Sequence, residues 1–143
     1  MARIVVGIDG SDHAKEALRW ALEEARLRGA TLRVVNAWTA PVYVGYAAVS
    51  GAVLDPALFK DAADEQIETA VKEILGDATD VPVERKTVEG TAASVLVEEA
   101  EGADLLVVGS RGHGGFAGLL LGSVSQQCAQ HSLCPVVIVH AAR

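Results

Sequence analysis

The 143-residue sequence is poor in cysteine, and its two cysteines, Cys128 and Cys134, do not form a CxxC pair. This scarcity excludes a disulfide framework and a ribbon-type zinc site, and it favours reduced thiols. The sequence also lacks long apolar runs, and Asp9 follows the N-terminus too early for a signal peptide. We therefore expect a cytoplasmic protein that does not cross a membrane.

Positive charge is scarce, because 12 Lys and Arg residues stand against 19 Asp and Glu residues and the net charge is -7. Duplex nucleic acid is not an expected partner, since contacts with phosphates need clustered Lys and Arg. No Asp or Glu follows Asp104, so the remaining chain carries only Arg111 and Arg143 as formal charges. Because screening acts over about 8 to 10 Å in physiological salt, an anion bound near Arg111 remains compatible with an acidic chain.

Hydrophobic residues are abundant, at 50% of the chain, and suffice for one compact domain spanning residues 1–143. Strands without short hairpin turns, apolar along their length, indicate a parallel sheet covered by helices on both faces, the α/β class. Hydrophobic spacing predicts strands at 4–8, 31–38, 81–88, 103–109 and 135–140, alternating with helices at 11–29, 55–76, 91–100 and 123–133.

Residues 39–54, TAPVYVGYAAVSGAVL, do not fit this alternation and form a long connection that holds both tyrosines, Tyr43 and Tyr46. A loop of this length in a compact domain is usually functional or disordered. A lid or interface role and a partly ordered surface excursion both remain open for this segment.

The stretch GSRGHGGFAGLLLGSVS, residues 109–125, contains six glycines and directly follows an apolar strand. In open α/β sheets, ligands bind beyond the carboxyl ends of the strands. A glycine-rich turn that leads into a helix N-terminus supplies unpaired N–H groups and a partial positive charge, which suit a phosphate. Ser123 can add a hydroxyl, and we expect it to be the N-cap of the following helix.

Three familiar loops can be tested against this stretch. The P-loop pattern GxxxxGK[ST] fails because no lysine follows Lys86, which argues against fast phosphoryl transfer. Gly112, Gly114 and Ala117 satisfy GxGxxG/A, but no acidic residue follows to hold a ribose, so a dinucleotide site is disfavoured. Residues 122–125 read GSVS instead of GxSxG, so serine hydrolase chemistry is not expected.

The remaining spacing is Gly109-x2-Gly112-x9-Gly122-Ser123. It resembles the nucleotide-binding signature G-x2-G-x9-G-[S/T] of the universal stress protein family. Similarity to that family extends over nearly the whole chain, through the segments IVVGIDGSDHAKEALRWA, VVNAW, ADLLVVGSRG and LLLGSVSQQCAQHSLCPVVIVH. The resemblance implies a Rossmann-like fold related to the adenine nucleotide α-hydrolases, with strand order 3-2-1-4-5. In that order the first and fourth strands are neighbours, so Asp9 and Gly109 would face one crevice.

The resemblance also implies an ATP site with Mg²⁺ carried mainly by the phosphates and waters, as that ion prefers. Asp9 matches the acid that meets the adenosine, and Gly7 and Ala37 match the adenine pocket. The remaining implied contacts are the ribose and phosphate turn at Gly109, Arg111 and Gly112, and the phosphate-binding helix start at Gly122, Ser123, Val124 and Ser125.

Plainer interpretations exist for several of these residues. Asp9 suits a turn with Ser11 as well as a ligand contact, and Arg111 and His113 suit an exposed loop. Trp20 and Trp38 are expected to pack rather than to stack on a cofactor. A zinc site at Cys128, His131 and Cys134 is disfavoured, because a structural zinc needs four such ligands.

The final strand, residues 135–140 or PVVIVH, would lie at the sheet edge and invite pairing, and the resemblance implies a homodimer through it. The first hypothesis is an ATP-binding stress sensor or regulator with an unknown protein partner and at most slow ATP hydrolysis. A nucleotide-free dimeric scaffold is the alternative. An enzyme related to the α-hydrolases is a third possibility, but it would need a base in the crevice beyond Asp9.

Overall fold

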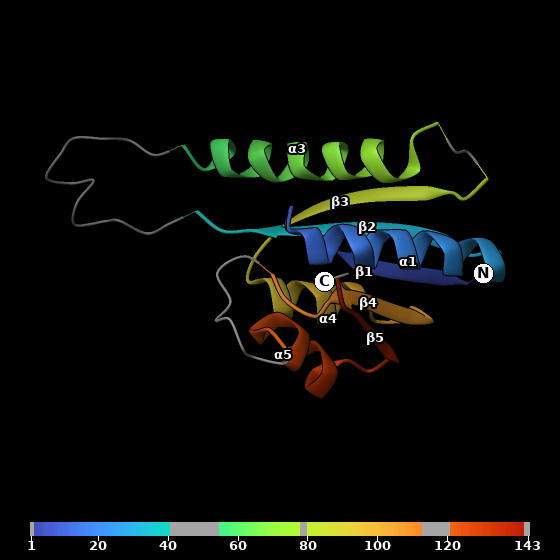
Figure 1. Ribbon diagram of the computed structural model, residues 1–143. Coiled ribbons are helices and arrows are strands. Elements are labelled where there is room, and N and C mark those ends of the chain that lie inside the picture. Colours follow the sequence, from blue (N-terminus) through green and yellow to red (C-terminus); the bar gives the residue numbers. More distant parts are fainter. Residues whose placement is uncertain (1, 41–54, 78–79, 113–120, 142–143) are drawn as a thin grey trace, which may run out of the picture.

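The computed structural model describes residues 2–40, 55–77, 80–112 and 121–141, which form a parallel sheet between two layers of helices (Figure 1). The sheet order is β3-β2-β1-β4-β5, which confirms the predicted topology and the α/β class. The domain extent of 1–143 stays a prediction. The strands are β1 (Arg3–Gly7), β2 (Thr31–Trp38), β3 (Val83–Glu89), β4 (Leu105–Gly109) and β5 (Val136–Val139). The helices are α1 (Asp12–Arg28), α3 (Pro56–Leu75), α4 (Ala92–Glu99) and α5 (Ser123–His131).

Each face of the sheet has its own hydrophobic core. Helices α1 and α3 cover one face, where Leu18 and Ile67 pack on β1, β2 and β4. Helices α4 and α5 cover the other face, where Leu96 and Cys128 pack on the alternate residues of the same strands. Because β1 and β4 pair directly, with Val5 opposite Leu106, the carboxyl ends of these two strands lie side by side.

The predicted helix signals at α1 and α3 are confirmed. Ser11 caps α1, since its hydroxyl accepts the Ala14 N–H at 3.2 Å, and Gly29 ends the helix with φ of 63°. Asp55 caps α3 in the same way and precedes Pro56 at the first helical position. Thr91 occupies the N-cap of α4, but its side chain makes no capping hydrogen bond.

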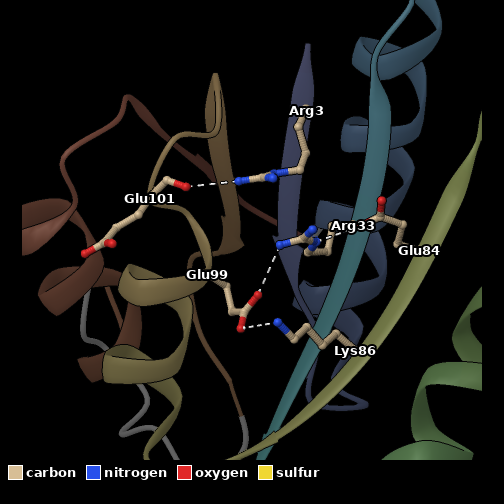
Figure 2. Close-up of polar contacts among 6 residues, drawn as sticks. All are labelled: Arg3, Arg33, Glu84, Lys86, Glu99 and Glu101. Atoms are coloured by element: carbon tan, nitrogen blue, oxygen red, sulfur yellow. Dashed lines mark hydrogen bonds and ion pairs between the residues drawn. The ribbon is translucent and has the colours of Figure 1, made fainter. Parts of the chain in front are cut away.

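Strand β3 lies at the edge of the sheet and is more polar and more exposed than the other strands. Figure 2 shows the ionic network that occupies one of its faces. Arg33 contacts Glu84 at 2.8 Å and Glu99 at 3.3 Å, and Lys86 reaches the same Glu99 carboxylate at 2.9 Å. Glu84, Arg85 and Lys86 are exposed in succession, so polar residues lie on both faces of this edge strand.

Several predicted features need adjustment. Helix α5 ends at His131 rather than near Leu133, because Ser132 adopts an extended conformation and its hydroxyl accepts the Cys134 N–H. Trp38 is partly buried as expected, whereas Trp20 is 37% exposed and lies outside both cores. The predictions for residues 41–54, with Tyr43 and Tyr46, and for His113 lie outside the described residues.

Within the described residues, no helix combines the length and the apolar character needed to cross a membrane. Likewise, no group of three His, Cys, Asp or Glu residues in that part of the chain could hold a metal ion.

The buried thiol of Cys128 yields a prediction about reactivity. Cys128 is completely buried, and burial raises the pKa of its thiol to about 11. At pH 8 roughly one thiol in a thousand is then ionised, and the thiolate is the reactive form. We expect Cys134→Ser protein to react with Ellman's reagent only as fast as it unfolds, and the reaction to become rapid in denaturant. Rapid labelling of the folded variant would contradict the buried position.

Candidate functional site

A pocket of about 280 Å³ opens at the carboxyl ends of β1, β2 and β4, against the starts of α4 and α5. This is where the chain direction changes between β1 and β4, the expected ligand position in an open α/β sheet. The predicted shared crevice is confirmed in that respect, because Asp9 and Gly109 both line it. The volume lies near the lower end of the range for small-molecule sites.

All ten residues predicted from the sequence line this pocket, although their contacts with a ligand stay a prediction. They are Gly7, Asp9, Ala37, Gly109, Arg111, Gly112, Gly122, Ser123, Val124 and Ser125. Seven further residues were missed: Ile8, Ala14, Val35, Asn36, Ala92, Leu96 and Val108. Asn36 and Val108 directly precede predicted residues at strand ends, and Val35 lies two residues before Ala37, a signal that could have found them. Ala92 and Leu96 enter through the packing of α4, which no local motif announces.

The floor of the pocket is apolar, and Gly7 lies against Leu96 there. A Cβ atom at Gly7 would lie 2.6 Å from Cδ1 of Leu96, so the glycine lets that side chain reach the sheet. Val35 and Val108 line the same apolar part. A flat heterocycle suits such a surface better than a phosphate does, because burying an unpaired charge is costly.

The signature glycines are packed against the protein itself. A Cβ atom at Gly109 would lie 2.8 Å from the carbonyl carbon and oxygen of His13, at the start of α1. At Gly112 it would meet Oδ2 of Asp9 at 2.5 Å, and at Gly122 the Cα of Arg111 at 3.2 Å. These glycines therefore bring α1, the β4 turn and α5 together, whatever they also do for a ligand.

Asp9 makes the expected turn contact and also lines the pocket, while its contact with a ligand stays a prediction. Its Oδ1 accepts the Ser11 N–H at 2.9 Å, which is the expected turn contact. Its Oδ2 approaches Gly112, and the residue lines the pocket. The turn at the end of β1 thus fixes a carboxylate at the pocket wall.

The start of α5 corrects one prediction, because Gly122 and not Ser123 is the N-cap. The Gly122 N–H is held by the carbonyl of Ser110 at 2.6 Å, and the Gly122 carbonyl accepts the Gln126 N–H. This long-range bond places the cap one residue earlier than the serine pattern indicated. Ser123 is the first helical residue, and its hydroxyl accepts a hydrogen bond from Gln127 at 3.0 Å.

The hydroxyl of Ser125 is directed to backbone carbonyls and not into the pocket. It is buried and donates to the carbonyls of Ser110 and Gly122, at 3.0 and 2.9 Å. The donors suited to an anion are therefore the first-turn N–H groups of Ser123, Val124 and Ser125, since none of the described side chains caps this helix. They carry the positive end of the helix dipole.

The charged residues that line the pocket are Asp9 and Arg111. Arg111 follows β4, beside Gly122, and therefore lies on the α5 side of the pocket. A cation and a helix N-terminus on that side favour an anionic group there, while the other end of the pocket is apolar. The arrangement fits a ligand with an aromatic base and a phosphate.

Comparison with known proteins gives a family match over almost the whole chain, with residues 1–140 matching the model described as the universal stress protein family. A universal stress protein of Thermus aquaticus is 38% identical over 143 residues, which cover 95% of this chain and 96% of that protein. One from Mycolicibacterium smegmatis is 36% identical over 144 residues. The match covers 95% of this chain but only 45% of that relative, so the chain spans less than half of its length.

Among solved structures, a universal stress protein in complex with cAMP is similar, with a TM-score of 0.71 and 31% identity. The similarity covers 99% of this chain and 98% of that one.

Proposed function

The chain belongs to the universal stress protein family, and from this premise we propose that its pocket binds an adenine nucleotide, ATP foremost. The bound state would regulate the contacts of the protein with a partner in the stress response, in the cytoplasm. The observation that carries the proposal is one pocket that joins an apolar floor to a helix N-terminus beside Arg111, where none of the described side chains makes a capping hydrogen bond. The cAMP complex of a 31% identical family member supports the ligand class.

In this proposal the two ends of the pocket hold the two ends of the nucleotide. The adenine lies on the apolar floor near Gly7 and Ala37, and Asp9 meets the adenosine. The turn with Gly109, Arg111 and Gly112 follows the ribose and the first phosphate. The phosphates meet the α5 start, which comprises Gly122, Ser123, Val124 and Ser125.

Magnesium would be carried mainly by the phosphates and water, because Asp9 is the only carboxylate among the described residues that line the pocket. Hydrolysis, where it occurs, would be slow. Among the described residues, the pocket lining holds no lysine to stabilise charge at the γ-phosphate, and Asp9 belongs to the adenosine end in this arrangement. Binding is therefore the main activity that we propose.

The direct test is a calorimetric titration of the purified protein with ATP, ADP, AMP and cAMP, with and without Mg²⁺. We expect one nucleotide per chain, and native mass spectrometry of fresh protein would detect a copurified nucleotide as added mass. A folded protein, as judged by circular dichroism, that binds none of the four would contradict the proposal.

That negative result would favour the alternative, a nucleotide-free dimeric scaffold that acts through protein contacts. One observation favours this candidate: Gly109, Gly112 and Gly122 each pack against atoms of the chain itself. The glycine pattern alone is therefore compatible with close packing and no ligand.

We also propose that the protein forms a homodimer through β5, within residues 135–140. Among the described residues β5 pairs with β4 alone, and all four of its residues are partly exposed. The carbonyls of Pro135 and Val139 accept hydrogen bonds from the N–H groups of Leu106 in β4 and of Ser110 just after it, so the backbone groups of Ile138 point to the open edge. An open edge of this kind pairs readily with a second strand.

Replacing Ile138 by proline tests the dimer, because it removes an N–H on the open edge and leaves the β4 ladder intact. We expect Ile138→Pro to be monomeric by light scattering at about 10 µM, where the wild type is dimeric. Ile138→Ala removes similar packing but keeps the N–H, so it should remain dimeric. A monomeric wild type, or a dimeric proline variant, would contradict pairing through this edge.

A further inference from the structure

Ser110, directly after β4, links the pocket to the β5 edge. It is 1% exposed, and its N–H donates to the Val139 carbonyl of β5 at 2.8 Å. Its carbonyl accepts the Gly122 N–H at 2.6 Å and the Ser125 hydroxyl at 3.0 Å. One buried residue thus fixes the start of α5 and the end of the edge strand.

The hydroxyl of Ser110 makes a further hydrogen bond, with His13 of α1. Oγ of Ser110 lies 3.0 Å from Nδ1 of His13, in the first turn of α1. The same Nδ1 accepts the N–H of Ala141, just after β5, at 3.4 Å. His13 therefore connects α1 with residues that follow β4 and β5. It was not among the site residues predicted from the sequence.

We propose that His13 is a positioning residue, which acts through Ser110 on the start of α5 and through Ala141 on the end of β5. This inference rests on the proposed nucleotide site where it concerns affinity. The clasp, meaning His13, Ser110 and Ala141, would hold the first-turn N–H groups of α5 in place for the phosphates. It would also couple the pocket to the proposed dimer edge.

The clasp depends on which nitrogen of His13 carries a proton. Because the Ala141 N–H donates to Nδ1, that nitrogen must present its lone pair, and Ser110 then acts as the donor to it. A side chain at position 13 therefore needs a hydrogen-bond acceptor at this point to keep both contacts of the clasp.

Other ionisable groups lie close to the clasp along the chain and must cancel in the test. They are Asp9, Asp12 and Glu16 around the start of α1, Arg111 after β4 and His140 after β5. A comparison of variants at one pH leaves these groups, and the titration of the nucleotide phosphates, the same on both sides.

Two variants of His13 separate the acceptor from the ring. Asparagine can place its Oδ1 near the position of Nδ1 and accept at every pH, whereas alanine accepts nothing. We would measure amide hydrogen exchange by NMR at Ser110, Gly122 and Ala141 in the ligand-free protein, and the Kd for ATP of each variant. His13→Ala should speed exchange and weaken ATP about fivefold, the equivalent of one net hydrogen bond. His13→Asn should stay within twofold of the wild type at pH 7.5.

Rescue by His13→Asn provides the reading that a merely structural role would not move. His13→Asn should keep the slow exchange at Ala141 that His13→Ala loses, and equally fast exchange in the two variants would overturn the clasp. Unchanged exchange in His13→Ala would overturn it as well. Faster exchange in His13→Ala with unchanged ATP affinity would limit the clasp to β5 and refute its positioning role. A wild type that binds no ATP but shows the exchange effects would refute the proposed function and leave the clasp standing.

Discussion

Ser123→Glu should abolish nucleotide binding without harming the fold. Ser123 is the first residue of α5 and lines the pocket where we place the phosphates. Two like unit charges about 5 Å apart repel by about 3 kcal/mol at an effective dielectric constant of 20, which weakens binding more than a hundredfold. The same carboxylate at a helix N-terminus stabilises the helix by about 0.3–1 kcal/mol. The substitution thus affects ligand affinity and protein stability in opposite directions.

Ser123→Gln is the matched control, since glutamine has nearly the same size as glutamate and no charge. Its Kd for ATP should stay within about fivefold of the wild-type value, and both variants should be titrated by calorimetry and unfolded in urea. A glutamate variant that binds ATP as tightly as the glutamine variant would show that the phosphates do not reach α5. Equal losses in both variants would instead point to a steric effect at this position.

The fold could be predicted well because its signals are local. The largely apolar run placed β2 at its observed limits, 31–38, and Ser11, Gly29 and Asp55 marked helix ends through their own neighbours. Boundaries that depend on distant partners were less accurate. The cap of α5 falls on Gly122 because Ser110, on another element, holds its N–H. No pattern within residues 121–125 could reveal that bond.

The candidate site shows the same division. The residues that belong to the family motif or lie at strand ends were predicted to share one site, and they line one pocket. Ala92 and Leu96 of α4 also line it but were not predicted. Ser125 belongs to the helix start that the resemblance assigned to the phosphates, but its hydroxyl is buried against backbone carbonyls. Sequence patterns therefore identified most residues that line the pocket, but three-dimensional packing determines which of their atoms can contact a ligand.

The glycines illustrate why the packing matters for interpretation. A glycine that clears space for a ligand and a glycine that clears space for another helix look identical in a sequence. At Gly109 the nearest obstacle to a Cβ atom is the backbone of His13, which cannot rotate away as a side chain could. Glycine is therefore needed at position 109 first of all for the close approach of α1 to β4. Fully buried core residues such as Leu18 of α1 and Val107 of β4 depend on that approach.

Gly109→Ala should consequently be the most destabilising of these substitutions. Its Cβ would lie 2.8 Å from the carbonyl group of His13, so α1 must shift within a close-packed core. Overpacking of this kind costs about 1–3 kcal/mol, and we expect the upper end because the obstacle is backbone. The free energy of unfolding in urea measures the loss. Gly122→Ala meets its nearest atom at 3.2 Å and should lose about 1 kcal/mol or less.

The affinity of the folded fraction of Gly109→Ala for ATP decides between the two reasons for this glycine. If its clearance serves α1, the protein that remains folded should bind ATP within a few-fold of the wild type, and added nucleotide should raise its midpoint of unfolding. A variant as stable as the wild type that fails to bind ATP would show the opposite. The space at Gly109 would then belong to the ligand, and α1 could yield without cost.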